Sequence, residues 1–520
     1  MENLCVFGGS VWTGRAESYP ADTVLTDGHK IKAVGIFEDV RKHPLFPSSR
    51  MLELNGESVV PGLSDSHLHL LAYAKQKTAS DLTAAKNKQD MLDILREQAS
   101  KMKPDDWVCG CNFNESNWPG GVMPDWDDLD ALEIPNPVLI QRVCTHITVI
   151  NRKATELCGA GDATGGILAE GAQAAAHSAM SRAMHNNRGR LSESLKNALD
   201  ECASYGLTCL YTCGADSLGM EEPMSLYQDL YASDNLSARV FAFHDRLPSP
   251  EMTTGFGNRW IGYQGHKIFL DGSLGARTAA LSEAYFDAPG KKGALLHETK
   301  DLAELLARLE ACGCQALVHA IGDAALDQLL EALESARGAS APRGLPLLVN
   351  HCMVCRPDQI ARMRRLGVGA TIQPTFVCSD RRMAPPRLGK RIDEGIAYPW
   401  RALSDAGIIL NGSSDCPIEP LNPWQAIWAA AERKTDALAE PWMPGQCLSV
   451  EEALRLYTVN PALSSGTESW RGTVEVGKEA DFVILDRNIF TQPAVALRET
   501  KAVSTVAGGR VTHGDAAWTR

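Results

Sequence analysis

Two histidines separated by one residue, His67 and His69, stand in the segment DSHLHL directly after a short apolar run. In an extended strand, side chains two positions apart point to the same side, so both imidazoles can reach one cation. Imidazole is a common ligand of zinc and similar ions. Because two nearby histidines are also frequent as plain polar residues at a strand end, the pair alone does not establish a metal site.

Four more residues of ligand-forming type end or follow apolar runs elsewhere in the chain. They are Lys267 in HKIFLDG, His319 in QALVH, His351 after LPLLVN and Asp415 after GIILNGSS. Because the carboxyl ends of barrel strands meet at one mouth, we expect these side chains to converge with the histidine pair. His319 and His351 are each compatible with a hydrogen-bonded core histidine, but the joint placement of all these residues indicates a metal site.

Asp415 and Lys267 each have two interpretations. Asp415 can cap the helix that follows, or its carboxylate can bind a cation and take a proton from water. Lys267 as an ammonium, with a reference pKa of about 10.4, would repel a metal. It either pairs with Asp271 or reacts with carbon dioxide to give a carbamate, an anionic bridge between two metals. The residues alone leave this choice open.

Eight short apolar runs recur along the chain, with helical patterns between several of them. The pattern over 301–311 predicts a helix, and a second helix starts at Gly322 with Asp323 in the capping position. Continuous apolar runs are typical of strands buried on both faces. The count predicts an α/β fold, a (β/α)8 TIM barrel, with a doubly wound open sheet as the alternative. The predicted strands cover 58–63, 206–212, 239–244, 266–270, 315–319, 345–350, 368–373 and 407–411.

Two parts of the chain do not fit this repeat. The connection between the first two runs is too long for a single βα loop and predicts an inserted subdomain at about 80–200. Short apolar stretches broken by turn residues at both ends predict a small β-sandwich domain made from 1–58 and 466–520. The barrel is then expected over 59–465.

Composition excludes several classes of protein. The formal net charge of −13 argues against nucleic acid or an anionic membrane as partner. No apolar run approaches the roughly 18 residues of a membrane span, and the N-terminal residues lack a signal-peptide pattern. The 15 cysteines predict free thiols in the cytoplasm. Cys352 and Cys355 have CxxC spacing, which we interpret as two thiols beside a buried strand.

At these residues the sequence resembles the amidohydrolase superfamily, and within it the amidohydrolase family 3 (YtcJ-like) branch that contains N-substituted formamide deformylase. The resemblance covers nearly the whole chain. DGSLGARTA and HAIGD together are typical of the branch, whereas the histidine pair is typical only of the superfamily. The motifs are VVPGLSDSHLHL, NWPGGVMPDWDDLDA, KIFLDGSLGARTAAL, LVHAIGDAALDQLLEALE, the stretch from VNHCMV to GVGATIQP, GSSDCPIEPLNP and VEVGKEADFVILD.

The resemblance implies a metal centre with one or two divalent ions, zinc being the expected metal. The histidine pair would bind the more buried ion, and a carboxylated lysine would bridge to a second ion held by the other two histidines. Asp415 would bind the first ion, act as general base and hand its proton to the leaving amine. The implied ligands are His67, His69, Lys267, His319, His351 and Asp415.

The resemblance also implies that Arg142 and His146 lie towards the substrate pocket. Asp271 and Arg277 are further candidates for substrate binding, with a surface arginine in a tight turn as the alternative for Arg277. The chain has Cys144 and Thr145 where the family usually shows an Asp-Gly pair, and Asn350 precedes His351 where Glu-His is common. These departures bear on the substrate more than on the metal site.

The expected activity is hydrolysis of a carbon–nitrogen bond in a small-molecule amide, first of all an N-substituted formamide, by metal-activated water. A cyclic amidase and an amino-heterocycle deaminase are alternatives. The deaminase ranks lower because HAIGDAA lacks the glutamate that such enzymes carry after the strand-5 histidine. A metal-binding scaffold without catalysis is the non-enzyme alternative. The sequence does not determine the oligomeric state, and a homodimer is one possible state.

Overall fold

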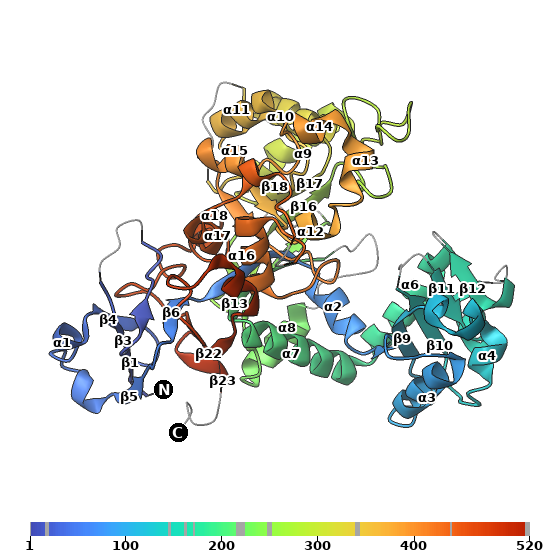
Figure 1. The fold of residues 1–520 in the computed structure, drawn as a ribbon, viewed down its shortest axis with the longest axis horizontal. Coiled ribbons are helices and arrows are strands. Elements are labelled where there is room, and N and C mark those ends of the chain that lie inside the picture. The colour runs from blue at the N-terminus through green and yellow to red at the C-terminus, as the bar shows by residue number, and fades with distance from the viewer. Residues whose placement is uncertain are drawn as a thin grey trace. The chain divides into compact units, whose positions relative to one another are not determined.

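The structure is a computed structural model, which describes residues 2–15, 20–143, 147–160, 164–169, 172–214, 224–246, 252–338, 344–436 and 439–514. The chain divides into two compact units (Figure 1). The first contains Met1–His69, Leu199–Gly214 and Tyr227–Arg520, and the second contains Leu70–Ala198 and Ala215–Leu226.

A parallel barrel forms the centre of the first unit. Its first and last strands meet at their carboxyl ends, where the amide of Asp415 bonds to the carbonyl of His67 at 2.9 Å and the amide of His69 to the carbonyl of Cys416 at 2.8 Å. This architecture confirms the predicted TIM barrel. In spatial order the strands are β7 (Leu63–Leu68), β13 (Leu207–Cys213), β14 (Arg239–His244), β16 (Ile261–Phe269), β17 (Gln315–Ala320), β18 (Leu348–His351), β19 (Gly369–Ile372) and β20 (Leu410–Gly412).

The first predicted barrel strand, 58–63, is wrong. Ser58–Pro61 form β6, which pairs antiparallel with β21 (Phe482–Leu485) outside the barrel. The barrel begins with β7, which itself contains the ligand motif. Both strands are buried along their whole length, so burial pattern alone does not tell them apart.

Amphipathic helices cover the barrel strands, and Figure 1 shows α10 (Asp323–Arg337) and α11 (Pro357–Leu366) outside β17 and β18. Helix α9 (Thr299–Ala311) contains the predicted 301–311 and buries Leu302, Leu306 and Leu309 at helical spacing. Helix α10 begins one residue later than predicted. Gly322 is its N-cap, and the carboxylate of Asp323 instead accepts a hydrogen bond from the amide of Ser282.

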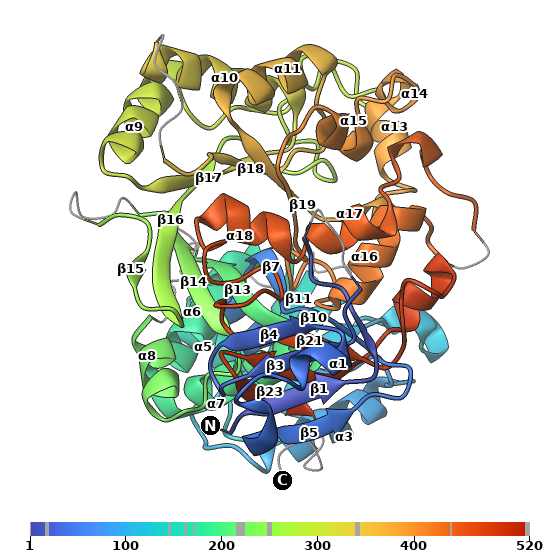
Figure 2. The same ribbon diagram turned by 90° about the vertical axis from the view of Figure 1, so that its left-hand side faces the viewer.

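Both ends of the chain form two β-sheets in the first unit (Figure 2). A four-stranded sheet has the order β4 (Ile31–Gly35), β3 (Thr23–Thr26), β1 (Leu4–Phe7), β5 (Arg50–Glu53). A five-stranded sheet has the order β2 (Ser10–Val11), β6, β21, β22 (Ala502–Ala507), β23 (Arg510–Gly514). Val6 and Val24 of the first sheet share a core with Phe482 and Val506 of the second, as the predicted β-sandwich requires.

The second unit is built on its own sheet, with strands in the order β12 (Ile167–Ala169), β11 (Ile147–Ile150), β10 (Val138–Arg142), β9 (Val108–Phe113), β8 (Ser80–Asp81). Helices α3 (Lys88–Ala99) and α6 (Gln173–Asn186) accompany it. Met91 and Leu95 of α3 pack with Val108 and Val138 of the sheet. This part of the chain is the predicted insertion. None of the described helices is both long and apolar enough to span a bilayer.

Candidate metal centre

The predicted ligands of the first metal meet at the carboxyl end of the barrel. His67 lies on β7, His69 follows that strand, and Asp415 follows β20. The Nε2 atom of His67 lies 2.9 Å from Oδ1 of Asp415, and Nε2 of His69 lies 3.4 Å from the same oxygen. Two imidazoles and one carboxylate therefore face one point, although about 350 residues separate them in the chain.

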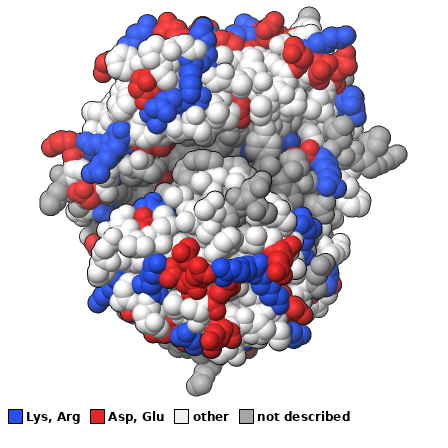
Figure 3. All heavy atoms as spheres, turned by 90° about the vertical axis from the view of Figure 1, so that its right-hand side faces the viewer, with Lys and Arg blue, Asp and Glu red and all other residues white. Residues whose placement is uncertain are grey.

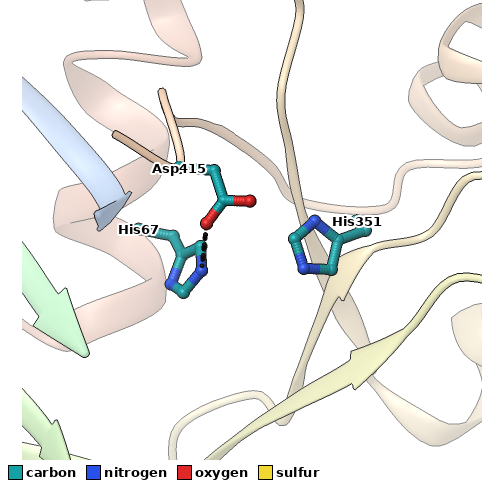
Figure 4. Close-up of side chains that lie close together, drawn as sticks. All are labelled: His67, His351 and Asp415. Atoms are coloured by element: carbon teal, nitrogen blue, oxygen red, sulfur yellow. Dashed lines mark ion pairs between the residues drawn. The ribbon is translucent and has the colours of Figure 1, made fainter. Parts of the chain in front are cut away.

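His351, at the end of β18, approaches the same point from across the barrel mouth. Its ring centroid is 5.8 Å from that of His67 and 4.5 Å from that of His319. His67, His351 and Asp415 each offer one ligand atom, and these atoms lie within 4.8 Å of one another (Figure 4). This spacing and this donor set fit one divalent cation with nitrogen and oxygen ligands.

Burial lowers the pKa values of His67, His319 and His351 and so keeps these three side chains neutral. It lowers the pKa of His67 to about 3 and that of His319 to about 4, and the positive charge of Lys267 acts in the same direction. Burial would raise the pKa of Asp415, but the interactions with His67 and His69 outweigh it and hold that pKa well below its usual range. Neutral imidazoles and an ionised carboxylate are the protonation states that bind a metal.

The site is accessible to solvent on one side. The side chains of His69 and His319 are 18% and 14% exposed, whereas that of His67 is 1% exposed. Solvent therefore reaches His69 and His319, whereas His67 lies in the barrel interior.

Two of the ligand candidates have left-handed backbone. His351 has a φ of 77° and Asp415 a φ of 56°, and Cys352 next to His351 has a φ of 49°. Such conformations cost roughly 1–3 kcal/mol for residues other than glycine and are concentrated at functional sites. The backbone is therefore strained at the residues whose side chains point into the barrel mouth.

A glutamine that the sequence analysis missed orients His351. Oε1 of Gln373 lies 2.8 Å from Nδ1 of His351, and Nε2 of Gln373 donates to Oγ of Ser413 at 2.8 Å. The carbonyl oxygen can only accept, so Nδ1 carries the proton and Nε2 holds the lone pair. Nε2 lies 2.9 Å from Nδ2 of Asn350, the residue that replaces the usual glutamate. The sequence signal that could have identified Gln373 is its place as the polar last residue of the predicted strand 368–373, VGATIQ.

His319, on β17, is held from one side. Its Nε2 lies 3.1 Å from the carbonyl oxygen of Gly272 and 3.4 Å from Oδ1 of Asp271. Nε2 therefore carries the proton, which leaves Nδ1 as the ring atom that can bind an ion. Asp271 accepts backbone hydrogen bonds from Ala280, Ile321 and Gly322 at 2.9–3.1 Å. Its role in substrate binding stays a prediction.

Lys267, on β16, is buried at the same end of the barrel. Its Nζ lies 5.1 Å from the centroid of the Phe269 ring, and burial lowers its pKa. In the described part of the chain Lys267 forms no ion pair with Asp271, which removes the simpler of its two interpretations. The other alternative for Asp415 is removed as well, because Asn422 caps the next helix, α16 (Pro423–Glu432).

Asp65 is a second residue that the sequence analysis missed. Its carboxylate accepts the amide hydrogen of His67 at 3.1 Å and the amide and hydroxyl hydrogens of Ser414 at 3.2 and 2.5 Å. It therefore joins β7 to the segment that carries Asp415. Burial raises the pKa of Asp65 to about 7. Its place two residues before His67, on the same side of the strand, was the only signal for this role.

Comparison with known proteins assigns the chain to a family. A family model described as "Amidohydrolase family" matches residues 50–513. The chain belongs to the amidohydrolase family. It is 29% identical to the putative amidohydrolase YtcJ of Bacillus subtilis (strain 168), over 97% of this chain and 98% of YtcJ. It is 26% identical to N-substituted formamide deformylase of Arthrobacter pascens, over 98% of each chain.

A solved structure supports the same assignment. An uncharacterized metal-dependent hydrolase from Pyrococcus horikoshii OT3 is 27% identical, with a TM-score of 0.81, over 95% of this chain and 99% of that one. This amidohydrolase is therefore a hydrolase that acts on carbon–nitrogen bonds, the enzyme class predicted from its sequence. Its family is metal-dependent, and the His/Asp group at the barrel mouth is its candidate metal site.

The remaining substrate-binding candidates form ion pairs with other residues of their own unit or lie outside the described residues. In the second unit, Arg142 donates to both carboxylate oxygens of Glu115, at 2.8 and 3.0 Å. Arg277 follows β16 and forms a bidentate pair with Asp287 at 2.9–3.0 Å. His146 lies outside the described residues. The roles of these residues in substrate binding stay predictions.

Proposed function

We propose that this amidohydrolase cleaves the carbon–nitrogen bond of an N-substituted amide, with N-substituted formamides as the first candidates. The supporting observation is the ionised carboxylate of Asp415, 2.9 Å from His67 and directed at the point where the histidines meet. The similarity to N-substituted formamide deformylase over 98% of the chain supports the choice of substrate class.

The chain's own residues supply the proton transfers in this proposal. When bound, a divalent cation, for which we propose zinc, lowers the pKa of water and polarises the amide carbonyl. Asp415 then takes the proton of the attacking water and passes it to the leaving amine, which would otherwise depart as a poor leaving group. His67, His69 and Asp415 would hold the ion, and His351, which the resemblance assigns to a second ion, also lies within ligand distance. The buried surroundings strengthen every charge interaction at the site.

We also propose that Lys267 carries a carbamate, which together with His319 and His351 would hold a second ion. The lysine nitrogen would form a bond to the carbon of carbon dioxide and lose a proton, giving an anion. This reaction needs an unprotonated amine, and burial lowers the pKa of Lys267. The side chain lies near the histidines, since its charge acts on both His67 and His319, and its Nζ is 5.1 Å from the centroid of the Phe269 ring.

We also propose that the protein is cytoplasmic and that its partner is a small molecule. The described cysteines form no disulfide, which supports a cytoplasmic location. Acidic and basic side chains are interspersed on the face drawn in Figure 3 rather than gathered by sign. Together with the net charge of −13, this supports a small molecule rather than nucleic acid as the partner.

The variant Asp415→Asn tests the general base. It keeps the size of the side chain but removes the basic oxygen, so we expect kcat on an N-formyl substrate to fall by about 10²–10⁴-fold. Metal content is measured on the same sample at saturating zinc, so that loss of the ion and loss of the base are separated. Hydrolysis unchanged in the metal-loaded variant would remove Asp415 as the base.

The matched control is Asp481→Asn. Asp481 is equally buried but pairs with Arg239 at 2.9 Å, beside β21, and we expect its variant to keep kcat within a few-fold. A panel of N-formyl, N-acetyl and cyclic amides tests the substrate class. The proposal expects the N-formyl compounds to give the highest kcat/KM, and a preference for cyclic amides would contradict it.

A further inference from the structure

The strand next to β7 in the barrel ends in a cysteine that contacts both histidines of the motif. Strand β13 runs parallel to β7, with Thr212 opposite Leu68, so its last residue, Cys213, lies beside the histidines. The Sγ atom of Cys213 is 3.1 Å from Nδ1 of His67, and its carbonyl oxygen is 3.0 Å from Nδ1 of His69. Cys213 is 2% exposed.

These two contacts fix which ring atoms face the ion. A carbonyl oxygen only accepts hydrogen bonds, so Nδ1 of His69 carries the proton and its Nε2 holds the lone pair. On His67 the thiol occupies the Nδ1 side, which directs Nε2 toward Asp415 on the other side of the ring. Ligand histidines in metal sites are commonly oriented in this way by a partner at the second ring nitrogen.

We propose that Cys213 is the positioning residue of the metal centre, which holds the Nδ1 atoms of both motif histidines so that both Nε2 atoms point at the ion. The carbonyl contact to His69 is available with any residue at this position. The thiol contact to His67 depends on the side chain. The sulfur lies on the opposite side of the imidazole from Asp415, so the thiol supports a ligand and is not itself a ligand.

The inference concerns the metal centre and does not depend on which amide is the substrate. The proposed positioning role gives a function to the contact between the buried thiol of Cys213 and Nδ1 of His67. Cys209, four residues earlier on the same strand, is also buried, and among the described residues no hydrogen bond joins it to either histidine. Cys209 therefore offers a matched control with the same loss of volume in the same strand.

The test measures zinc affinity by competition with a chromophoric chelator in Cys213→Ala, Cys213→Ser and Cys209→Ala. We expect Cys213→Ala to bind zinc about 10–100-fold more weakly. Cys213→Ser retains a hydrogen-bonding group and should recover part of that loss, and Cys209→Ala should match the parent protein. Unchanged affinity in Cys213→Ala would overturn the proposal. If Cys213→Ala does not fold, the test is made with Cys213→Ser. We then expect this variant to bind zinc more weakly than the parent protein, and an unchanged zinc affinity would overturn the proposal.

Two spectroscopic readouts separate positioning from a general structural effect and from direct ligation. Long-range ¹H–¹⁵N spectra of the zinc-loaded protein report which ring nitrogen of each histidine is protonated. In Cys213→Ala the His67 signals should change while those of His69 stay as they are; an equal change in both would show a general distortion and contradict the proposal. A sulfur-to-cobalt charge-transfer band in the cobalt-loaded parent, lost in Cys213→Ser, would show direct ligation and overturn it.

Discussion

At the scale of single residues, His351 is positioned by two amide side chains with different roles. Gln373 accepts the proton of Nδ1, whereas Asn350 contacts Nε2, the atom that must turn to an ion. Metal binding therefore has to replace the contact with Asn350 but can keep the contact with Gln373. We infer that Gln373 is the partner on which the orientation of His351 depends.

The variant Gln373→Leu tests this dependence. It leaves the buried Nδ1 hydrogen of His351 without its acceptor, a cost of about 1–3 kcal/mol, and should weaken zinc binding by about 10–100-fold. Isothermal titration with zinc measures the change. Gln328→Leu is the control, since Gln328 is also buried but donates to the carbonyl of His297 at 2.6 Å. Equal zinc affinity in the two variants would contradict the inference.

The candidate metal ligands could be predicted from the sequence, but the residues that orient them could not. His319 and His351 stand out because an imidazole after an apolar run is a recognisable ligand type. Asp65 and Gln373 have only weak positional signals, because the function of these residues and of Cys213 depends on the register between neighbouring strands. The hydrogen bond that Ser414 donates to Asp65 spans 349 positions in the chain and exists only once β7 and β20 are adjacent.

At the scale of elements, the long loop after β16 packs closely against the start of α10 at Gly322. A side chain on Gly322 would overlap the carbonyl oxygen of Ala280. Asp271 fastens the same junction, because it accepts hydrogen bonds from the amides of Ala280 and Gly322. Since Asp271 and Gly272 also hold His319, the packing of these two segments determines where that histidine lies.

The variant Gly322→Ala should therefore push the loop away from α10. We expect a loss of about 1–3 kcal/mol in the free energy of unfolding, measured by urea denaturation, together with weaker zinc binding. Gly275→Ala is the control from the same loop, where an added Cβ meets nothing within 4 Å. Equal stability of the two variants would show that the junction is not close-packed.

The types of the elements were more predictable than their partners. The patterns for α9 and for seven of the barrel strands were assigned to the correct element type. The first strand was wrong because two buried strands follow each other, with only Gly62 between β6 and β7. Buried strands have the same composition whichever sheet they join, so the partner of β6 is decided by residues 482–485, far along the chain.

At the scale of the whole molecule, a bound ion would connect strands that are distant in sequence. The ligand atoms of His67, His351 and Asp415 come from β7, β18 and the segment after β20. An ion that binds only the folded chain stabilises it according to its concentration, by about 2.7 kcal/mol at 100 times the dissociation constant. The fold and the metal site are therefore thermodynamically linked.

Removal of metal tests this linkage. Dialysis against a chelator should lower the Tm and abolish hydrolysis, and added zinc should restore both; calorimetry and an amide hydrolysis assay follow the two changes. A variant with both His67→Ala and His351→Ala should show no response of Tm to zinc. A parent protein whose Tm does not respond to zinc would indicate that the ion contributes nothing to the stability of the barrel.

The direct passage from β6 into β7 also constrains how the protein is made on the ribosome. The strand that leads into the histidine motif emerges early, yet its partner β21 is translated some four hundred residues later. Until then β6 has only the two-residue strand β2 beside it, and its other edge, which β21 later covers, is unpaired; an unpaired edge of an apolar strand is a site of aggregation. Truncated chains that stop before residue 482 should accordingly be retained by chaperones, even when every metal ligand has already been synthesised.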